Sequence, residues 1–153
     1  MDHRVEASLS FLTLWRTHSW LGNFITGDEK GVLFYNVHRR AQWVDKGDEA
    51  EDVTKPSMHV KKVMLCIWWS VYGVEYWELL DEGKKVTAKL YVSQLQKLKA
   101  HLQLTRGEQA NIYFQHDNAS PHTARSTKAE LLKYGWKILP HPPYSPDLSF
   151  RFF

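Results

Sequence analysis

Apolar and polar stretches alternate along the chain in a way that predicts a β-hairpin near its middle. Residues 63–71 form a continuous apolar run, which is typical of a strand buried on both faces. Gly73 predicts a turn, and residues 74–80 predict the returning strand of the hairpin. We therefore expect two neighbouring antiparallel strands here, followed by a further turn at residues 81–83.

A long helix is expected directly after this hairpin. Thr87 is suited to cap its first turn, because a threonine hydroxyl can accept a hydrogen bond from an unpaired backbone N–H. Four leucines that follow lie broadly on one helical face, and lysine and glutamine take the other positions. We therefore expect this helix to pack its leucine face on the sheet. The leucines are Leu90, Leu95, Leu98 and Leu102.

Two further strands are expected on either side of these elements, and each runs into an aspartate. Residues 24–26 predict a strand that enters a turn at residues 27–30, which contains Asp28, before extended structure resumes. Residues 110–115 predict another strand, which ends just before Asp117. Both aspartates are therefore expected at turns beside the ends of strands.

The rest of the chain completes a mixed pattern. Helices are expected at residues 5–14 and 123–134, and Gly135 is suited to end the second one. Residues 136–139 predict a last short strand, and the polar residues 45–56 predict a loop. From the first strand onward the order is strand, hairpin, helix, strand, helix, strand. Such an order is typical of a mixed α/β sheet with helices on its faces.

Composition narrows the class of protein without identifying it. At 153 residues the chain fits one domain, and its net charge of +3 permits nucleic-acid binding without requiring it. Cys66 is the single cysteine, which excludes an intrachain disulfide and a Cys-rich zinc site; we interpret it as a buried core residue. No apolar run approaches the ~20 residues that cross a bilayer, and the first residues do not resemble a secretory signal. We therefore expect no membrane partner.

Asp28 and Asp117 are the candidate chemical groups, because each follows an apolar strand. Carboxylates at neighbouring strand ends can converge on one pair of metal ions. Magnesium prefers oxygen ligands, and two metals roughly 3.5–4 Å apart can stabilise both the attacking and the leaving oxygen of a phosphodiester. The alternative is that each aspartate only stabilises a turn or caps a helix. The chemistry of the residues leaves both interpretations open.

Several segments resemble the mariner transposases of the Tc1/mariner superfamily. The resemblance covers essentially the whole chain and is most specific in two long segments, one around Asp117 and one near the C-terminus. The segments that carry it are residues 26–30 (TGDEK), 116–124 (HDNASPHTA), 139–148 (LPHPPYSPDL), the paired tryptophans Trp68 and Trp69 with Gly73, and residues 91–98.

The resemblance implies an RNase H-like, or retroviral integrase-like, α/β core with a mixed sheet flanked by helices. It implies a linker helix region at residues 1–23 and a catalytic core at residues 24–153 that is incomplete at its C-terminus, without the family's helix-turn-helix domain. Members of the family use three aspartates to bind Mg²⁺ or Mn²⁺, cleave DNA at transposon ends and join it to a TA target. On this chain Asp28 matches the first ligand and Asp117 the second. DNA as partner, a homodimer and a nuclear location are therefore expected.

The third ligand of the family has no match on this chain. The family spacing, counted from Asp117, reaches Phe152, whose ring cannot bind a hard cation. Asp147 is an acid nearby, but the family already has an aspartate there in a different role. We therefore expect that catalysis is lost or weak in this chain.

Candidate contacts to nucleic acid follow from the same resemblance. They lie beside the two aspartates, in the segments that match the family. Three histidines in or near these segments lack the spacing of a zinc site, and we expect them to support the motif instead. The candidate DNA contacts are Lys30, Asn118, His122 and Arg125, and the three histidines are His116, His122 and His141.

Two alternatives to a degenerate transposase core remain open. The chain could be a functional nuclease whose third ligand comes from Asp147 or from another chain. It could also be a non-catalytic module for DNA binding or dimerisation that derives from a transposase. The family also occurs fused to a SET methyltransferase domain, but no segment of this chain resembles such a domain.

Overall fold

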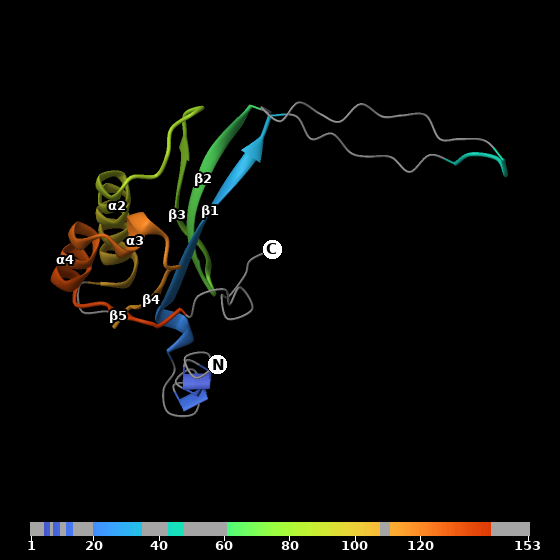
Figure 1. The fold of residues 1–153 in the computed structure, drawn as a ribbon. Coiled ribbons are helices and arrows are strands. Elements are labelled where there is room, and N and C mark those ends of the chain that lie inside the picture. Colours follow the sequence, from blue (N-terminus) through green and yellow to red (C-terminus); the bar gives the residue numbers. More distant parts are fainter. Residues whose placement is uncertain are drawn as a thin grey trace.

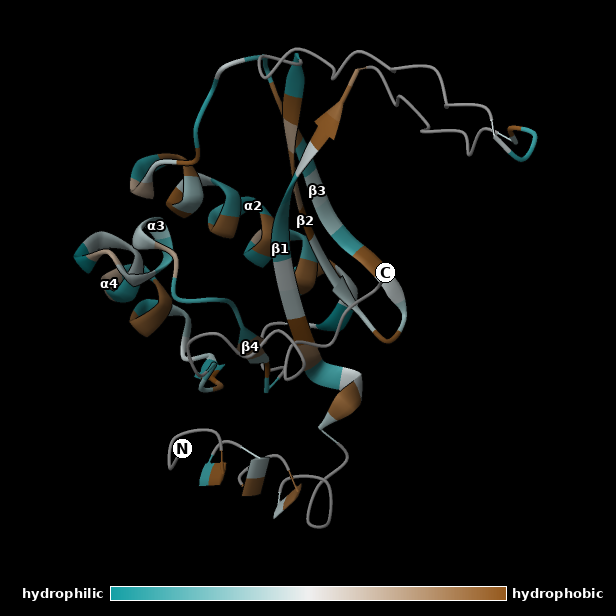
Figure 2. Ribbon diagram, turned by 45° about the vertical axis from the view of Figure 1, so that its right-hand side comes forward, coloured by the Kyte–Doolittle hydropathy of each residue, from teal (hydrophilic) through white to brown (hydrophobic). Residues whose placement is uncertain are grey.

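A mixed β-sheet with helices on one side forms the centre of the structure, a computed structural model that describes residues 5, 6, 8, 9, 12, 13, 20–34, 43–47, 61–107 and 111–141. Within these residues the strand order is β3-β2-β1-β4-β5. Figures 1 and 2 show α2, α3 and α4 together on one side of the strands. The elements are η1 Leu21–Asn23, β1 Phe24–Leu33, β2 Lys62–Ser70, β3 Gly73–Leu80, α2 Ala88–Arg106, β4 Tyr113–Gln115, α3 Ser120–Thr123, α4 Arg125–Tyr134 and β5 Lys137–Ile138.

The sheet combines antiparallel and parallel pairs, as the order of elements predicted. β1 pairs with β2 and β2 with β3 in antiparallel fashion, so the predicted hairpin is confirmed. β4 lies parallel to β1 on its other side, and β5 lies parallel to β4. β1 is therefore a central strand that joins the long hairpin to the shorter parallel half of the sheet.

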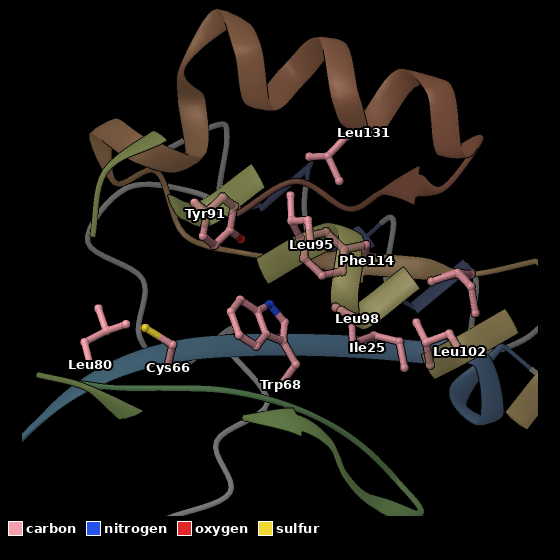
Figure 3. Packing of buried hydrophobic residues seen from close by; sticks show 11 residues of the cluster. Ile25, Cys66, Trp68, Leu80, Tyr91, Leu95, Leu98, Leu102, Phe114 and Leu131 are labelled. Atoms are coloured by element: carbon pink, nitrogen blue, oxygen red, sulfur yellow. The ribbon is translucent and has the colours of Figure 1, made fainter. Parts of the chain in front are cut away.

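The main hydrophobic core lies between the sheet and the helices (Figure 3). The strands contribute bulky side chains to it, and α2 contributes the leucine face that its sequence predicted, together with Tyr91. Cys66 is fully buried in this core, which confirms its interpretation as a core residue, and its burial raises the pKa of the thiol to about 11. The cluster consists of Ile25, Cys66, Trp68, Leu80, Tyr91, Leu95, Leu98, Leu102, Ile112, Phe114 and Leu131.

A smaller cluster marks the other face of the sheet. Phe24 of β1 and Tyr113 of β4 pack there with Trp20 and Leu139. Their strand neighbours Ile25 and Phe114 belong to the main core instead, because successive side chains of a strand point to opposite faces. Along β1, even-numbered positions therefore belong to the face without helices.

The prediction of a turn at residues 27–30 is wrong. β1 runs without interruption from Phe24 to Leu33, and its pairing with β2 continues through Asp28↔Ile67 to Leu33↔Lys62. The polar residues and glycines suggested a turn, but hydrogen bonds to the apolar strand β2 hold this stretch extended. Asp28 therefore lies in the middle of a strand rather than at its end.

The helix ends predicted at Thr87 and Gly135 are confirmed, and one predicted helix differs from the structure. The Thr87 hydroxyl accepts a hydrogen bond from the backbone N–H of Leu90 at 3.3 Å, and Gly135 ends α4 in the left-handed conformation with φ of 68°. The helix expected at residues 123–134 is divided, because Ala124 is extended and separates α3 from α4. The Thr127 hydroxyl, buried in α4, donates to the carbonyl oxygen of Pro121 at 2.7 Å and holds the two helices together.

Other predictions fall partly outside the described residues. Most of the expected helix at residues 5–14 and of the loop at residues 45–56 cannot be compared, and neither can residues 142–153. The strand predicted at residues 136–139 is present as the shorter β5. None of the helices formed by the described residues combines the length and apolar character that a membrane crossing requires.

Gly27 is the residue of β1 whose substitution should cost most for steric reasons. A Cβ atom at this position would lie 2.4 Å from Cδ1 and 2.5 Å from Nε1 of the buried Trp68 ring. We predict that Gly27→Ala lowers the free energy of unfolding by about 1–3 kcal/mol, the usual cost of overpacking. Gly31→Ala in the same strand is the control, since its Cβ would meet only the flexible Lys62 side chain at 3.5 Å. Urea unfolding would contradict the prediction if the two variants lost equal stability.

Candidate active site

Asp28 and Asp117 follow the last pair of the parallel β1–β4 pairing at the same distance in sequence. Thr26 pairs with Gln115 in this parallel pair; Asp28 lies two residues further along β1, and Asp117 lies two residues beyond Gln115, where β4 ends. Both aspartates are exposed, and Asp28 lies on the face of β1 opposite to Ile25 of the main core. His116, directly before Asp117, packs on Phe114 and Tyr91 of that core. Asp28 therefore lies on the face of β1 without helices, whereas Asp117 follows the end of β4 and its carboxylate bonds His122 of α3.

On the helical side of the sheet, a buried histidine connects β1 with the segment that follows β4. His122 of α3 lies between two carboxylates, with Nδ1 2.6 Å from Oδ1 of Asp117 and Nε2 3.0 Å from Oε1 of Glu29. The His122 side chain is only 3% exposed, whereas that of Asp117 is 51% exposed. A continuous chain of hydrogen bonds therefore leads from β1 through α3 to the end of β4.

The charges of this chain support one another. The hydrogen bond from His122, followed by the backbone N–H of Ala119, outweighs the effect of burial and lowers the pKa of Asp117 to about 2. Burial lowers the pKa of His122, but the hydrogen bonds to Asp117 and Glu29 outweigh it and raise this pKa to about 9. At neutral pH His122 is therefore a cation between two anions.

His116 has the opposite character although it lies beside His122. The two rings are stacked with centroids 5.3 Å apart and an angle of 9° between them. Burial first, and then the positive charge of His122, lower the pKa of His116 to about 4. Its Nδ1 lies 3.0 Å from the Tyr91 hydroxyl, and the Tyr91 ring centroid is 4.1 Å from that of His122. His116 is therefore a neutral, half-buried neighbour of this chain of hydrogen bonds.

The candidate DNA contacts are placed differently from one another. Lys30, Asn118 and Arg125 are exposed, and the Asn118 amide donates to the carbonyl oxygen of His141 at 2.6 Å. His122 is buried and both of its ring nitrogens are engaged, which favours its structural role over contact with a ligand. Asp147 and Phe152 lie outside the described residues.

Sequence reasoning did not assign a role to Glu29 or Tyr91. The signal for Glu29 was its place directly after Asp28, because the next residue of a strand points to the opposite face. Tyr91 was seen only as part of a segment that resembles the family, and nothing local indicates its contacts with two histidines. Within the described ranges, no three His, Cys, Asp or Glu side chains are grouped so that they could hold a metal ion by themselves.

Comparison with known families identifies the class of this chain. The profile of a family described as "Transposase (partial DDE domain)" matches residues 33–112, which is more than half of the sequence. The chain belongs to this transposase family.

Two curated relatives resemble the transposase chain over nearly all of its length. The Mariner Mos1 transposase of Drosophila mauritiana is 39% identical over 153 residues, which is 97% of this chain and 44% of the relative. The human Histone-lysine N-methyltransferase SETMAR is 38% identical over 151 residues, which is 96% of this chain and 22% of the relative. The mariner resemblance seen in the sequence is confirmed, and the chain spans less than half the length of either relative.

Solved structures of Mos1 share the fold of the transposase chain. A pre-cleavage Mos1 transpososome matches with a TM-score of 0.89 and 40% identity over 97% of this chain and 45% of the other. A Mos1 paired-end complex with Mn matches with a TM-score of 0.87 and 41% identity over 96% and 44%. The Mos1 catalytic domain matches with a TM-score of 0.74 and 36% identity over 97% and 63%. The predicted RNase H-like fold is therefore confirmed.

The two stacked histidines should give the stability of the transposase chain a maximum near pH 6.5, their ordinary pKa. Above it, folded His122 keeps a proton that the unfolded chain has lost, so stability falls as the pH rises towards about 9. Below it, the unfolded chain protonates His116 while the folded one does not, so stability falls as the pH drops towards about 4. Each effect is on the order of 3 kcal/mol.

Urea unfolding at a series of pH values tests this profile. His122→Gln should remove most of the loss above pH 6.5, and His116→Gln should remove most of the loss below it. His101→Gln is the control, because His101 is 42% exposed on α2 and lies outside the stack of His116 and His122. A wild-type profile that is flat from pH 5 to 8 would contradict the opposed pKa shifts of the two histidines.

Proposed function

We propose that this chain is a transposase catalytic core that cleaves and transfers DNA strands with the help of Mg²⁺ or Mn²⁺. The observation that supports the proposal is the parallel pairing of β1 with β4, whose last pair, Thr26↔Gln115, lies two residues before Asp28 and two residues before Asp117. The family membership of the chain and the paired-end complex of Mos1 with Mn support it. Asp28 and Asp117 are then the catalytic residues and the metal ligands.

The chemistry of these two side chains fits a hard divalent cation. Both are exposed carboxylates, and oxygen is the ligand that magnesium and manganese prefer. The low pKa of Asp117 keeps it ionised at any pH at which the protein would work. When bound, a divalent cation would stabilise the charge on the attacking and leaving oxygens of a phosphodiester. Lys30, Asn118 and Arg125 are exposed near these acids, and we propose that they contact the DNA backbone.

A third oxygen donor for the cation is not supplied at the family position. That position is Phe152, and the remaining acids after Asp117 are Glu130, which is bonded to Lys133 on α4, and Asp147. We therefore expect this chain to bind metal weakly and to cleave DNA slowly when it acts alone. Asp147 or another chain could complete the site. Residues 24–153 would form the core, residues 1–23 a linker, and the working form would be a homodimer in the nucleus.

The second candidate function is a non-catalytic module that binds DNA or mediates dimerisation. Phe152 in place of a third acid is the observation that favours it. Such a module would keep the fold and the exposed basic residues without needing Asp28 or Asp117. Plasmid binding that is independent of metal and unchanged when both acids are neutralised would support this function over cleavage.

Metal binding tests the primary proposal directly. We predict that Mn²⁺, followed by its electron paramagnetic resonance, binds weakly to the protein, and that Asp28→Asn or Asp117→Asn abolishes this binding because each removes a ligand. Asp81→Asn is the control, since Asp81 is an exposed aspartate that bonds Lys84 beyond the hairpin. Binding that survives in both ligand variants would contradict the assignment of the site.

Nicking of supercoiled plasmid separates the catalytic function from the non-catalytic one. We expect slow nicking with Mn²⁺ that falls to the metal-free level in Asp117→Asn and persists in Asp81→Asn. Nicking that is equal in the wild type and in Asp117→Asn would show a contaminating nuclease. Metal binding without any nicking would favour the second candidate function.

A further inference from the structure

We propose that Glu29 is a positioning residue for Asp117 and acts on it through His122. This inference rests on the proposed function, in which Asp117 is a metal ligand. The geometry that supports it is the unbroken chain of contacts, from Glu29 Oε1 to His122 Nε2 at 3.0 Å and from His122 Nδ1 to Asp117 Oδ1 at 2.6 Å. Glu29 would not touch the metal or the DNA itself.

β1 divides its two adjacent acids between its two faces. Asp28 is exposed and pairs in register with Ile67, while Glu29, the next residue, is only 15% exposed and reaches the helix α3. Alternation along a strand makes this division unavoidable once the register is fixed. One strand can thus present a ligand on one face and anchor a support on the other.

The side chain of His122 is held in place by packing and by hydrogen bonds at both ring nitrogens. Its ring is packed against Tyr91 at 4.1 Å and stacked on His116 at 5.3 Å between centroids, and its side chain is 3% exposed. Glu29 occupies the ring nitrogen that faces away from Asp117. A side chain that is packed and bonded at both ends is a rigid donor, and rigid supports of this kind orient metal ligands.

Asp117 accepts from His122 and from Ala119 at the same carboxylate oxygen. Oδ1 accepts from His122 and also from the backbone N–H of Ala119 at 2.9 Å. Two donors on one oxygen fix the rotamer of a side chain that is otherwise half exposed. Among the described residues these donors use only Oδ1, so Oδ2 is the oxygen that Asp117 can offer to a cation. Glu29 therefore helps to define a ligand with one available oxygen.

The test compares Glu29→Ala with Glu29→Gln in the whole chain. Alanine removes the acceptor for His122, whereas glutamine keeps an oxygen at nearly the same place. The first measurement is made without metal: the three-bond couplings of the Asp117 side chain, which report its χ1 rotamer by NMR. We expect a single rotamer in the wild type and in Glu29→Gln, and averaged rotamers in Glu29→Ala. Glu29→Val, which suits a strand, is measured beside it in case the alanine variant does not fold.

The second measurement is Mn²⁺ affinity by electron paramagnetic resonance on the same proteins. We expect Glu29→Ala to lose about tenfold in affinity, the usual effect of removing the support of a metal ligand, and Glu29→Gln to recover most of it. Glu78→Ala is the matched control, because Glu78 is also a partly buried acid on the helical side of the sheet but bonds Lys97 on α2. It should leave both the Asp117 rotamer and the metal affinity unchanged.

The outcomes separate this inference from the proposed function. A single Asp117 rotamer in Glu29→Ala or in Glu29→Val would overturn the positioning role, whatever the metal affinity shows. If the wild type bound no Mn²⁺ but these variants released the rotamer, the metal site would be refuted while the positioning role held. Release of the rotamer by Glu78→Ala as well would also overturn it, because the effect would then reflect a general loosening of the fold.

Discussion

The parallel pairing of β1 with β4 is the constraint on which the site depends. It joins a strand near the start of the described chain to one near its end, and its last pair, Thr26↔Gln115, lies two residues before each of Asp28 and Asp117. A shift of β4 by one residue would exchange the faces of Tyr113 and Phe114 and change where Asp117 follows the strand, because side chains alternate along a strand. The apolar pairs Phe24↔Tyr113 and Ile25↔Phe114 oppose such a shift, since each belongs to a different packed cluster. The core of the protein therefore fixes the geometry of its candidate chemistry.

Charges on His122 and its two carboxylate partners further stabilise the arrangement of residues at this site. A buried cation at His122 would be costly alone, but two carboxylates that accept its ring hydrogens stabilise it. The stacked His116 could not also be charged at this distance, and burial together with its neighbour holds it neutral. His122 thus donates from both ring nitrogens, while His116 is stacked on it and packs against Tyr91. This arrangement requires α3 to lie beside the middle of β1 and the end of β4, and the Thr127 hydroxyl bonds this four-residue helix to α4.

The sequence was sufficient to predict the sheet, the hairpin, the long helix with its Thr87 cap and the burial of Cys66, because each depends on local periodicity or on a single residue type. It was not sufficient for the path of β1. Gly27, Asp28 and Lys30 have low strand propensity, and only the partner strand β2 holds them extended. The resemblance to the family identified both aspartates, but their common register depends on a long-range pairing. The partnership of Glu29 with His122 joins residues far apart in sequence, so no local pattern could reveal it.

The contact between Gly27 and Trp68 links the main core to these acids. The Trp68 ring lies so close to the backbone of β1 that no side chain fits at position 27, and the same ring packs on Tyr76 and Tyr91. Tyr91 in turn contacts both histidines of the stack. The aromatic core thus touches the strand immediately before Asp28 and Glu29 and also touches the ring that binds Glu29. A change in the packing of Trp68 would therefore act on Asp28 through the backbone of β1 and on the partly buried Glu29 through Tyr91 and His122, so the position of both acids depends on the same ring.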